Sequence, residues 1–354
     1  MSRATVHNRQ GNRSLAAHRG DHAGSGATGI AEDHACAIIS MLLDAWAAAS
    51  GQPAFVTSTV EEITGAGAHV PRMGHRSRSG ISRPIQKWSA PGLLMKGGDA
   101  VNDWWKTFFD QDYLRIWGQV LTEEANAKQA AELWSMLDLN AGCRLLDAPC
   151  GWGRLSRQLA LRGAMVLGVD QSEILLNAAE AQRGGLPPER LRYLRHDLRK
   201  SLPEMGFDVA CNIFTSFGYG TEEEDVATFR TLRGALRPGG RVLVETNHRD
   251  LLCAFVSRGS NGSRRMPDGT FFIDEPEFDA ISGVVTLNWY WSGPGGSGEK
   301  HAKWRCYTPT QIVGLVERAG LRFAGAYKGL SKMPYKAEGP EAGGRLAVVA
   351  VRED

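Results

Sequence analysis

The sequence contains no run of about 18 apolar residues, the length that a membrane-spanning helix needs. Its first residues, MSRATVHNRQGNRS, include no apolar stretch of the kind found in secretory signals. The six cysteines form no CxxC pair and show no zinc-ligand spacing. We therefore expect no membrane anchor and no signal peptide, and we expect reduced thiols in a cytoplasmic protein.

The sequence also lacks a strong excess of charge. It has 41 Lys and Arg residues against 39 Asp and Glu, a formal net charge of +2, which argues against a nucleic-acid or membrane surface. Residues 72–87 are the exception, with five Lys or Arg residues and no acid. An anion-binding patch and a solvated linker both fit this segment, and its short length favours the linker. No acid cluster at ligand spacing is visible, so we expect no metal site.

The chain changes character along its N-terminal third. Residues 1–29 are expected to form a disordered or loosely ordered arm, because they carry too few apolar side chains to offset the entropy of ordering. Apolar residues then recur at helical spacing, which predicts a helical and lid region over residues 30–122. Aromatic residues crowd its end, at Trp104, Trp105, Phe108, Phe109, Tyr113 and Trp117. A core-facing stripe and a lid over a ligand site both account for these aromatic residues.

Short strands and helices alternate in the segment 123–250, after a first helix over residues 123–137. Strands are predicted at residues 144–147, 165–170, 191–194, 207–214 and 241–245, with helices at 153–162, 172–182 and 222–236. Such alternation is typical of a parallel sheet with helices on both faces. We therefore expect these residues to form a Rossmann-like core.

Residues 251–307 break the alternation. The stretches FFIDEPEFDA, GVVTLNWYWSG and KHAKWRCYT are typical of antiparallel strands joined by Gly-rich turns, and predict a β cap over the ligand face. Residues 308–354 complete the core with one helix and two strands, at 322–327 and 346–351. The expected fold is α/β: a Rossmann-like, doubly wound, mostly parallel seven-stranded sheet with an antiparallel β insertion and an N-terminal helical extension.

The segment LLDAPCGWGR, residues 145–154, joins the first predicted strand to the first predicted helix. Gly151 and Gly153 allow a sharp turn and a close approach of the backbone to a ligand. The helix that follows offers unpaired N–H groups at its start. Asp147 stands where the strand meets the loop and can accept a hydrogen bond. This order of strand, loop and helix predicts a ligand cradle.

Acids stand at the ends of three successive strands, at Asp147, Asp170 and Asp197. Ligands of open α/β sheets bind outside the carboxyl ends of the strands, so we expect these acids to share one site. Asp170 can accept from both hydroxyls of a ribose, and Asp197 from an adenine amino group. A dinucleotide is disfavoured, because Ser156 follows the glycines where the fingerprint needs Gly or Ala, and because a carboxylate is unfavourable beside a pyrophosphate.

The motifs DAPCGWGR, VLGVDQS, HDLRK and LRPGGRVLVE resemble those of class I S-adenosylmethionine-dependent methyltransferases. The resemblance extends over about residues 102–354 and is to bacterial small-molecule members with a β cap. Pro149 departs from it, since many members have Gly at that position. The resemblance implies the cofactor S-adenosyl-L-methionine, and methyl transfer to O, N or C of a small-molecule acceptor in natural product biosynthesis.

The resemblance also implies roles for single residues. It places the cofactor against Asp147, Ala148, Gly151, Gly153, Asp170, Gln171, Asp197, Leu198, Asn212 and Arg115. Asp170 with Gln171 is implied at the ribose, and Asp197 with Leu198 at the adenine. The resemblance also implies that the loop that starts at Asn212 passes beneath the sulfonium of the cofactor. Tyr113 and Arg115 are implied to cover the methyl group or to reach the cofactor carboxylate.

The implied acceptor chemistry is less specific. A base is needed only when the attacking atom carries a proton, and our candidate catalytic residues are His248, Tyr219 and Tyr113. The Asn/Asp-Pro-Pro-aromatic loop of base-methylating enzymes is absent, so we expect no nucleic-acid partner. The protein is expected to be a monomer or a homodimer. Two alternatives stay open: cleavage or cyclisation of the aminobutyryl part of the cofactor, which releases methylthioadenosine, and cofactor binding without catalysis.

Overall fold

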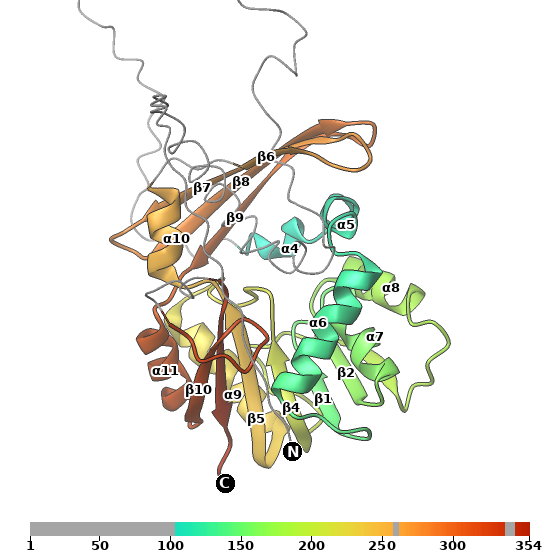
Figure 1. The fold of residues 1–354 in the computed structure, drawn as a ribbon, viewed down its shortest axis with the longest axis vertical. Helices are drawn as coiled ribbons and strands as arrows, with labels where there is room; N and C mark the ends of the chain where they lie inside the picture. The colour runs from blue at the N-terminus through green and yellow to red at the C-terminus, as the bar shows by residue number, and fades with distance from the viewer. Residues whose placement is uncertain (1–102, 258–261, 337–343) are drawn as a thin grey trace, which may run out of the picture.

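A computed structural model describes residues 103–257, 262–336 and 344–354 of the chain. The predicted arm, the predicted N-terminal helix and the basic segment at 72–87 lie outside these residues. The described residues form a core built on one β-sheet and a cap built on a second (Figure 1). No helix among them is long and apolar enough to cross a membrane.

Seven strands form the core sheet. They are β1 (Arg144–Asp147), β2 (Met165–Asp170), β3 (Leu191–Arg195), β4 (Phe207–Asn212), β5 (Leu236–Thr246), β10 (Arg322–Lys328) and β11 (Leu346–Val351). Their order across the sheet is β10-β11-β5-β4-β1-β2-β3. All neighbours pair in parallel except β11, which is antiparallel to β5 and β10. The predicted fold class is therefore confirmed.

Helices cover both faces of this sheet. They are α6 (Glu123–Met136), α7 (Arg154–Leu161), α8 (Glu173–Ala181), α9 (Glu222–Ala235) and α11 (Pro309–Arg318). Successive side chains of a strand point to opposite faces. Leu145 accordingly packs with α6 and α7, whereas Leu146 packs with α9 and α11. Because both faces are buried, the inner strands β2, β4 and β11 are mainly apolar, whereas the edge strands β3 and β10 are more polar and more exposed.

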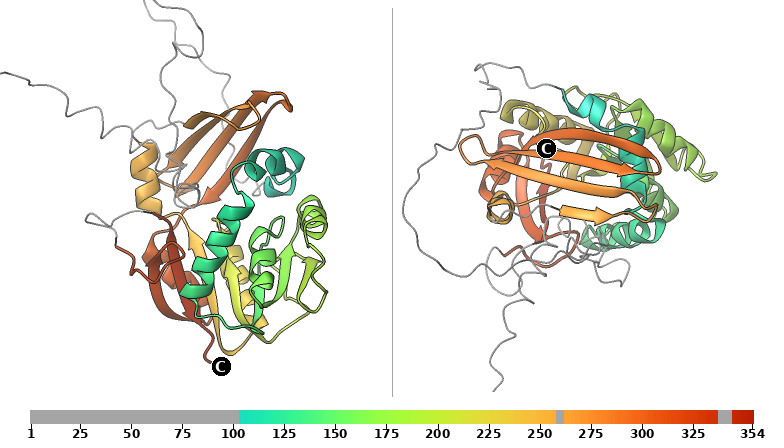
Figure 2. Two further views of the ribbon diagram at one scale, coloured as in Figure 1. Left: turned by 45° about the vertical axis from the view of Figure 1, so that its right-hand side comes forward. Right: turned by 90° about the horizontal axis from the view of Figure 1, so that it is seen from above.

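The cap lies between β5 and α11 in the sequence. It consists of helix α10 (Arg249–Val256) and the antiparallel strands β6 (Gly262–Arg265), β7 (Phe271–Asp279), β8 (Val284–Gly293) and β9 (Gly296–Arg305). Figures 1 and 2 show the cap sheet lying across the end of the core at which β5 leads into α10. Two short helices, α4 (Trp105–Phe108) and α5 (Gln111–Gly118), pack against its inner face, where Phe272 and Trp289 join Ile116 and Trp117 in one cluster.

Two elements of the cap were not predicted, and one strand is longer than expected. Helix α10 has eight residues, with Leu252 and Phe255 buried, which is too short for a clear helical repeat. Strand β6 reads GSRR and has no apolar alternation. Strand β5 begins at Leu236 rather than at 241, because Leu236 pairs with Phe207 before a register shift.

We predict that Gly153→Ala destabilises the protein by roughly 1–3 kcal/mol or more, because the position has φ +72° and an added Cβ would lie 2.2 Å from the Tyr193 hydroxyl oxygen. Gly234→Ala is the control, since it lies in α9 with nothing within 4 Å of the added atom. That change should leave stability equal or raise it by up to about 1 kcal/mol. Urea unfolding measures both variants, and equal stability of Gly153→Ala and the wild type would contradict this account.

Candidate active site

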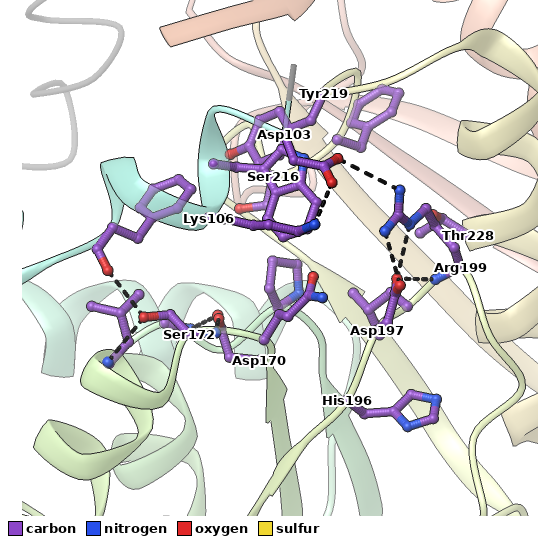
Figure 3. A pocket seen from close by; sticks show the side chains of 18 of the residues that line it. Asp103, Lys106, Asp170, Ser172, His196, Asp197, Arg199, Ser216, Tyr219 and Thr228 are labelled. Carbon is purple, nitrogen blue, oxygen red and sulfur yellow. Dashed lines mark hydrogen bonds and ion pairs between the residues drawn. The ribbon is translucent and has the colours of Figure 1, made fainter. Parts of the chain in front are cut away.

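A pocket of about 1090 Å³ lies at the carboxyl ends of the parallel strands, which is where open α/β sheets bind ligands. Its walls come from the segments after β1, β2 and β3, the loop before α9, and the residues around α4. In Figure 3, Asp170 and Asp197 lie on one side of the pocket, and Asp103, Ser216 and Tyr219 lie on the other. Gln171 and Leu198, both predicted at the cofactor, also line this pocket.

Asp170 ends β2 and ties two neighbouring segments together. Its Oδ2 accepts the Gly151 N–H at 2.8 Å, and its Oδ1 accepts the Ser172 N–H at 2.9 Å. Burial raises the pKa of this carboxyl group, while the two N–H donors act in the opposite direction. Each carboxylate oxygen keeps a second lone pair. Asp170 can therefore accept from two ligand hydroxyls while it holds the glycine loop against the start of α8.

Asp197 follows β3 and is oriented by Arg199. The guanidinium donates through Nε to Oδ1 at 3.0 Å and through Nη2 to Oδ2 at 2.9 Å. These hydrogen bonds hold the pKa of Asp197 below its usual value. Arg199 also binds Glu224 at the start of α9, at 3.1 Å. The segment after β3 is thus fixed from both sides, which leaves Leu198 as an apolar surface in the pocket.

The glycine loop reaches the pocket through Gly151, whose φ is +57°. Asp147 lies behind the loop with 3% of its surface exposed, and its Oδ2 accepts from the Ser156 hydroxyl at 2.5 Å. Burial raises the pKa of Asp147 to about 6. Ala148 and Gly153 are also buried and do not line the pocket. These three residues shape the loop from behind, and their predicted contact with the cofactor stays a prediction.

Backbone strain is concentrated in the loop after β4. Phe214 and Thr215 have φ values of 69° and 59°, which costs a non-glycine residue about 1–3 kcal/mol. The end of β5 holds both residues: Glu245 Oε2 accepts the Phe214 N–H at 3.1 Å, and the Glu245 carbonyl accepts the Thr215 N–H at 3.0 Å. Arg345 completes the arrangement, with Nε 2.9 Å from Glu245 Oε1 and Nη2 donating to Thr215 Oγ1 at 3.0 Å.

Asn212 supports this loop but lies outside the pocket lining. It is fully buried, and its Nδ2 donates to the Ser216 carbonyl at 3.2 Å. Asn212 thus lies beneath Ser216, which does line the pocket, and its predicted place against the cofactor stays a prediction. The sequence analysis missed Arg345 altogether, since a lone Arg after two glycines gives no sign of its partner on β5.

A second cavity of about 110 Å³ lies between α4, α5 and the inner face of the cap. Most of its lining side chains are aromatic or aliphatic. Four residues line both this cavity and the large pocket, and we call them the boundary residues: Phe109, Tyr113, Ser216 and Tyr219. Burial raises the pKa of Tyr113 and of Tyr219, so both hydroxyl groups stay protonated near neutral pH and neither is a ready base.

Two predicted site residues lie elsewhere. Arg115 pairs with Asp112 on its own helix at 3.3 Å and with Asp268 of the cap at 3.5 Å, and it does not line the pocket. Its predicted contact with the cofactor stays a prediction. His248 directly precedes the unpredicted helix α10 and lines neither cavity. Its Nδ1 lies 2.9 Å from the Tyr335 hydroxyl, and burial lowers its pKa. A catalytic role of His248 stays a prediction.

Comparison with known proteins identifies the family of the core domain. Residues 145–240 match a family model described as a methyltransferase domain. The domain belongs to the class I S-adenosylmethionine-dependent methyltransferases. The recognised family and its cofactor therefore agree with the predictions from the sequence motifs.

The curated relatives match only part of this chain, and this chain matches only part of each relative. A probable fatty acid methyltransferase of Mycobacterium tuberculosis is 32% identical over 158 residues, which is 41% of this chain and 35% of that protein. The chain spans 35% to 60% of the length of the first three curated relatives that it matches. The whole protein's activity therefore does not follow from these matches.

Solved structures show the fold. The CcbJ methyltransferase from Streptomyces caelestis aligns with a TM-score of 0.59 at 16% identity, over 70% of this chain and 99% of that one. An amino pentose methyltransferase from Micromonospora echinaspora, solved with S-adenosylmethionine bound, has a TM-score of 0.51 at 19% identity, over 68% of this chain and 97% of that one.

The large pocket of the methyltransferase domain fits S-adenosylmethionine. Its volume of about 1090 Å³ is slightly larger than the roughly 300–1,000 Å³ of typical small-molecule sites. Asp170 offers lone pairs for the ribose hydroxyls, and Leu198 offers an apolar surface for a flat base. Among the residues that the structure describes, no three His, Cys, Asp or Glu side chains gather in a metal-binding arrangement.

We predict that Asp170→Asn weakens binding of S-adenosylhomocysteine about tenfold or more, as measured by calorimetry. An amide has only one accepting oxygen, so it cannot serve the Gly151 and Ser172 N–H groups and the ribose hydroxyls together. Glu180→Gln is the control, because this exposed residue of α8 is remote from the pocket lining. An affinity of Asp170→Asn within about twofold of the wild type would remove Asp170 from the site.

The buried Asp147 predicts a pH dependence of stability. Its folded pKa of about 6 lies above the unfolded value of about 3.9, so the folded state binds more protons between these values and loses stability as pH rises. We expect urea unfolding of the wild type to show about 2–3 kcal/mol more loss between pH 4 and pH 7 than Asp147→Asn. Parallel pH curves for the two proteins would contradict the assignment of this shift to Asp147.

Proposed function

We propose that the protein transfers a methyl group from S-adenosylmethionine to a small-molecule acceptor. The observation that carries this proposal is the meeting of two unlike cavities at the boundary residues. The large pocket has carboxylates for a nucleoside that carries an amino acid, and the smaller cavity beneath the cap is mainly apolar. Two ligands in these cavities come together at Ser216 and Tyr219, which is what a direct group transfer requires.

Orientation is the main task of the chain's own residues. When bound, S-adenosylmethionine supplies a methyl group on a positively charged sulfur, which becomes a neutral thioether once the acceptor's lone pair has taken the methyl group. Asp170 holds the ribose end of the pocket, and the loop at Ser216 closes the other end. The rings of Phe109, Tyr113 and Tyr219 line both cavities, where they exclude water and can attract a positive charge.

The size of the smaller cavity limits what enters it. A volume of about 110 Å³ is below the roughly 300 Å³ of a site for a drug-sized ligand and is closer to a cavity of about 150 Å³ that holds benzene. The reacting end of the acceptor is therefore a single ring or a short chain. The amino pentose methyltransferase takes part in calicheamicin biosynthesis, which supports a small acceptor in secondary metabolism.

Several expectations accompany this proposal. The absence of a nucleic-acid partner, the cytoplasmic location, and the monomeric or homodimeric state stay predictions. The predicted domain boundaries after residues 29, 122, 250 and 307 also stay predictions.

Product analysis tests the proposed reaction. The full chain is incubated with methyl-labelled S-adenosylmethionine and a panel of small amines, alcohols and phenols. We expect S-adenosylhomocysteine and a labelled acceptor. Methylthioadenosine would instead show attack on the aminobutyryl part of the cofactor, and tight cofactor binding without either product across the panel would indicate a non-catalytic protein.

A pair of variants at Tyr219 tests the boundary. Tyr219→Ala should lower kcat/KM by about 10- to 100-fold, because it removes a ring that packs 4.9 Å from Trp104 and closes the site to water. Tyr219→Phe keeps the ring and should stay within a few-fold of the wild type. Equal activity of the alanine variant would mean that transfer does not occur at this boundary.

A further inference from the structure

A short segment crosses the large pocket on the side opposite its two acids. It comprises residues 103–109, which include α4, and we call it the roof segment. Four of its residues line the pocket: Asp103, Trp105, Lys106 and Phe109. In Figure 3, Asp103 lies across the pocket from Asp170 and Asp197, the acids placed at the nucleoside. A bound nucleoside would therefore be enclosed between these acids and the roof segment.

Arg199 joins the roof segment to the wall that carries Asp197. Its Nη1 lies 3.9 Å from Asp103 Oδ1, and its guanidinium carbon lies 5.4 Å from the centre of the Trp105 ring. The same guanidinium also binds Asp197 and Glu224, so it connects three parts of the pocket wall. The side chains of Arg199 and Asp103 are 35% and 37% exposed, which leaves their contact open to screening by salt.

Ser172 makes a second connection, next to Asp170. Its hydroxyl donates to the Phe109 carbonyl at 3.0 Å and accepts the Leu175 N–H at 3.2 Å, so it caps α8 and holds the roof segment at once. Its own N–H binds Asp170. Each of the two acids placed at the nucleoside is therefore linked to the roof segment through one residue.

The cap supports the same segment. Phe108 is 6% exposed, and its ring lies 4.8 Å from the ring of Trp289 on β8. Directly after the roof segment, Asp110 binds Lys300 of β9 at 2.6 Å, and the Lys300 side chain is 9% exposed. Arg199 and Ser172 thus join a segment that the cap already supports to the two walls that carry the acids.

We propose that Arg199 and Ser172 are positioning residues that hold the roof segment over the nucleoside end of the cofactor and so slow its release. The proposal rests on the proposed methyl transfer and assigns two further residues to its site. An enclosed nucleoside leaves only after these contacts open, so each contact adds to the barrier for release. A cofactor that stays longer gives the acceptor more time to bind, which raises the share of binding events that end in transfer.

Release of S-adenosylhomocysteine tests the proposal without turnover. The full chain is loaded with the tritiated compound at low salt, and release is followed after a chase with excess unlabelled compound. Asp103→Asn leaves the hydrogen bonds of Arg199 to Asp197 and Glu224 in place. The ion pair of Asp103 with Lys106 is also lost, but it lies within the roof segment and does not join it to the core. We expect release to be about two- to fivefold faster, as for the loss of an exposed ion pair. At about 0.5 M salt the rates of variant and wild type should converge, because salt screens this contact.

Ser172→Gly tests the second connection. It removes the hydroxyl donor at a cap position that tolerates Gly, and it should speed release about two- to tenfold at both salt concentrations. The conservative variant Ser172→Thr keeps the cap and the donor and should release the compound like the wild type. Asp103→Asn combined with Ser172→Gly should speed release by about the product of the two single effects.

Asp138→Asn is the matched control for Asp103→Asn. Asp138 pairs with Lys332 at 2.6 Å on the exposed surface, and neither residue lines the pocket. This variant should release the compound like the wild type, and thermal unfolding checks that each variant is folded.

Three outcomes overturn the proposal: release from the double variant within about twofold of the wild type, equal rates for Asp138→Asn and Asp103→Asn, or a Ser172→Thr variant as fast as Ser172→Gly. Failure of the wild type to bind S-adenosylhomocysteine in the loading step would instead contradict the proposed function itself.

Discussion

The buried ion pair between Glu245 and Arg345 is the interaction on which the site depends. Both side chains are about 95% buried, so removal of one partner would leave a buried charge, at about 3–5 kcal/mol. The pair joins the end of β5 to the start of β11 and fixes the left-handed backbone of Phe214 and Thr215. The guanidinium groups of Arg154 and Arg345 each lie 5.0 Å from the Phe214 ring centre, which adds a second constraint on the same loop.

This loop is one wall of the place where the two cavities meet, and the aromatic residues of α4 and α5 are the opposite wall. Tyr113 is the link between the walls and the glycine loop, because its ring packs 5.8 Å from Trp152 and 6.1 Å from Trp289 of the cap. The core, the lid helices and the cap thus share one aromatic cluster. Asn247 Oδ1 and the indole nitrogens of Trp104 and Trp304 have no hydrogen-bond partner among the described residues, and all three residues line the smaller cavity.

The sequence predicted the core well, because strand ends and apolar runs are local properties. Asp170 could be placed in the pocket from its position at the end of β2, and Leu198 from the family resemblance. The direction in which a side chain points could not be predicted from such local properties. Arg115 pairs with Asp112 and with Asp268 of the cap, and His248 meets the Tyr335 hydroxyl just before α10, a helix too short to predict. The pairing of Glu245 with Arg345 joins residues far apart in the sequence, and no local sequence pattern predicts it.

A crystal structure of the full chain with S-adenosylhomocysteine tests the central claim most directly, that the large pocket holds the cofactor and meets the acceptor cavity at the boundary residues. The account predicts ribose hydroxyls within hydrogen-bond distance of Asp170, the base against Leu198, and the sulfur at Ser216 and Tyr219, facing the cavity that contains Asp274. A nucleoside bound elsewhere, or a sulfur that faces away from Ser216 and Tyr219, would contradict the account.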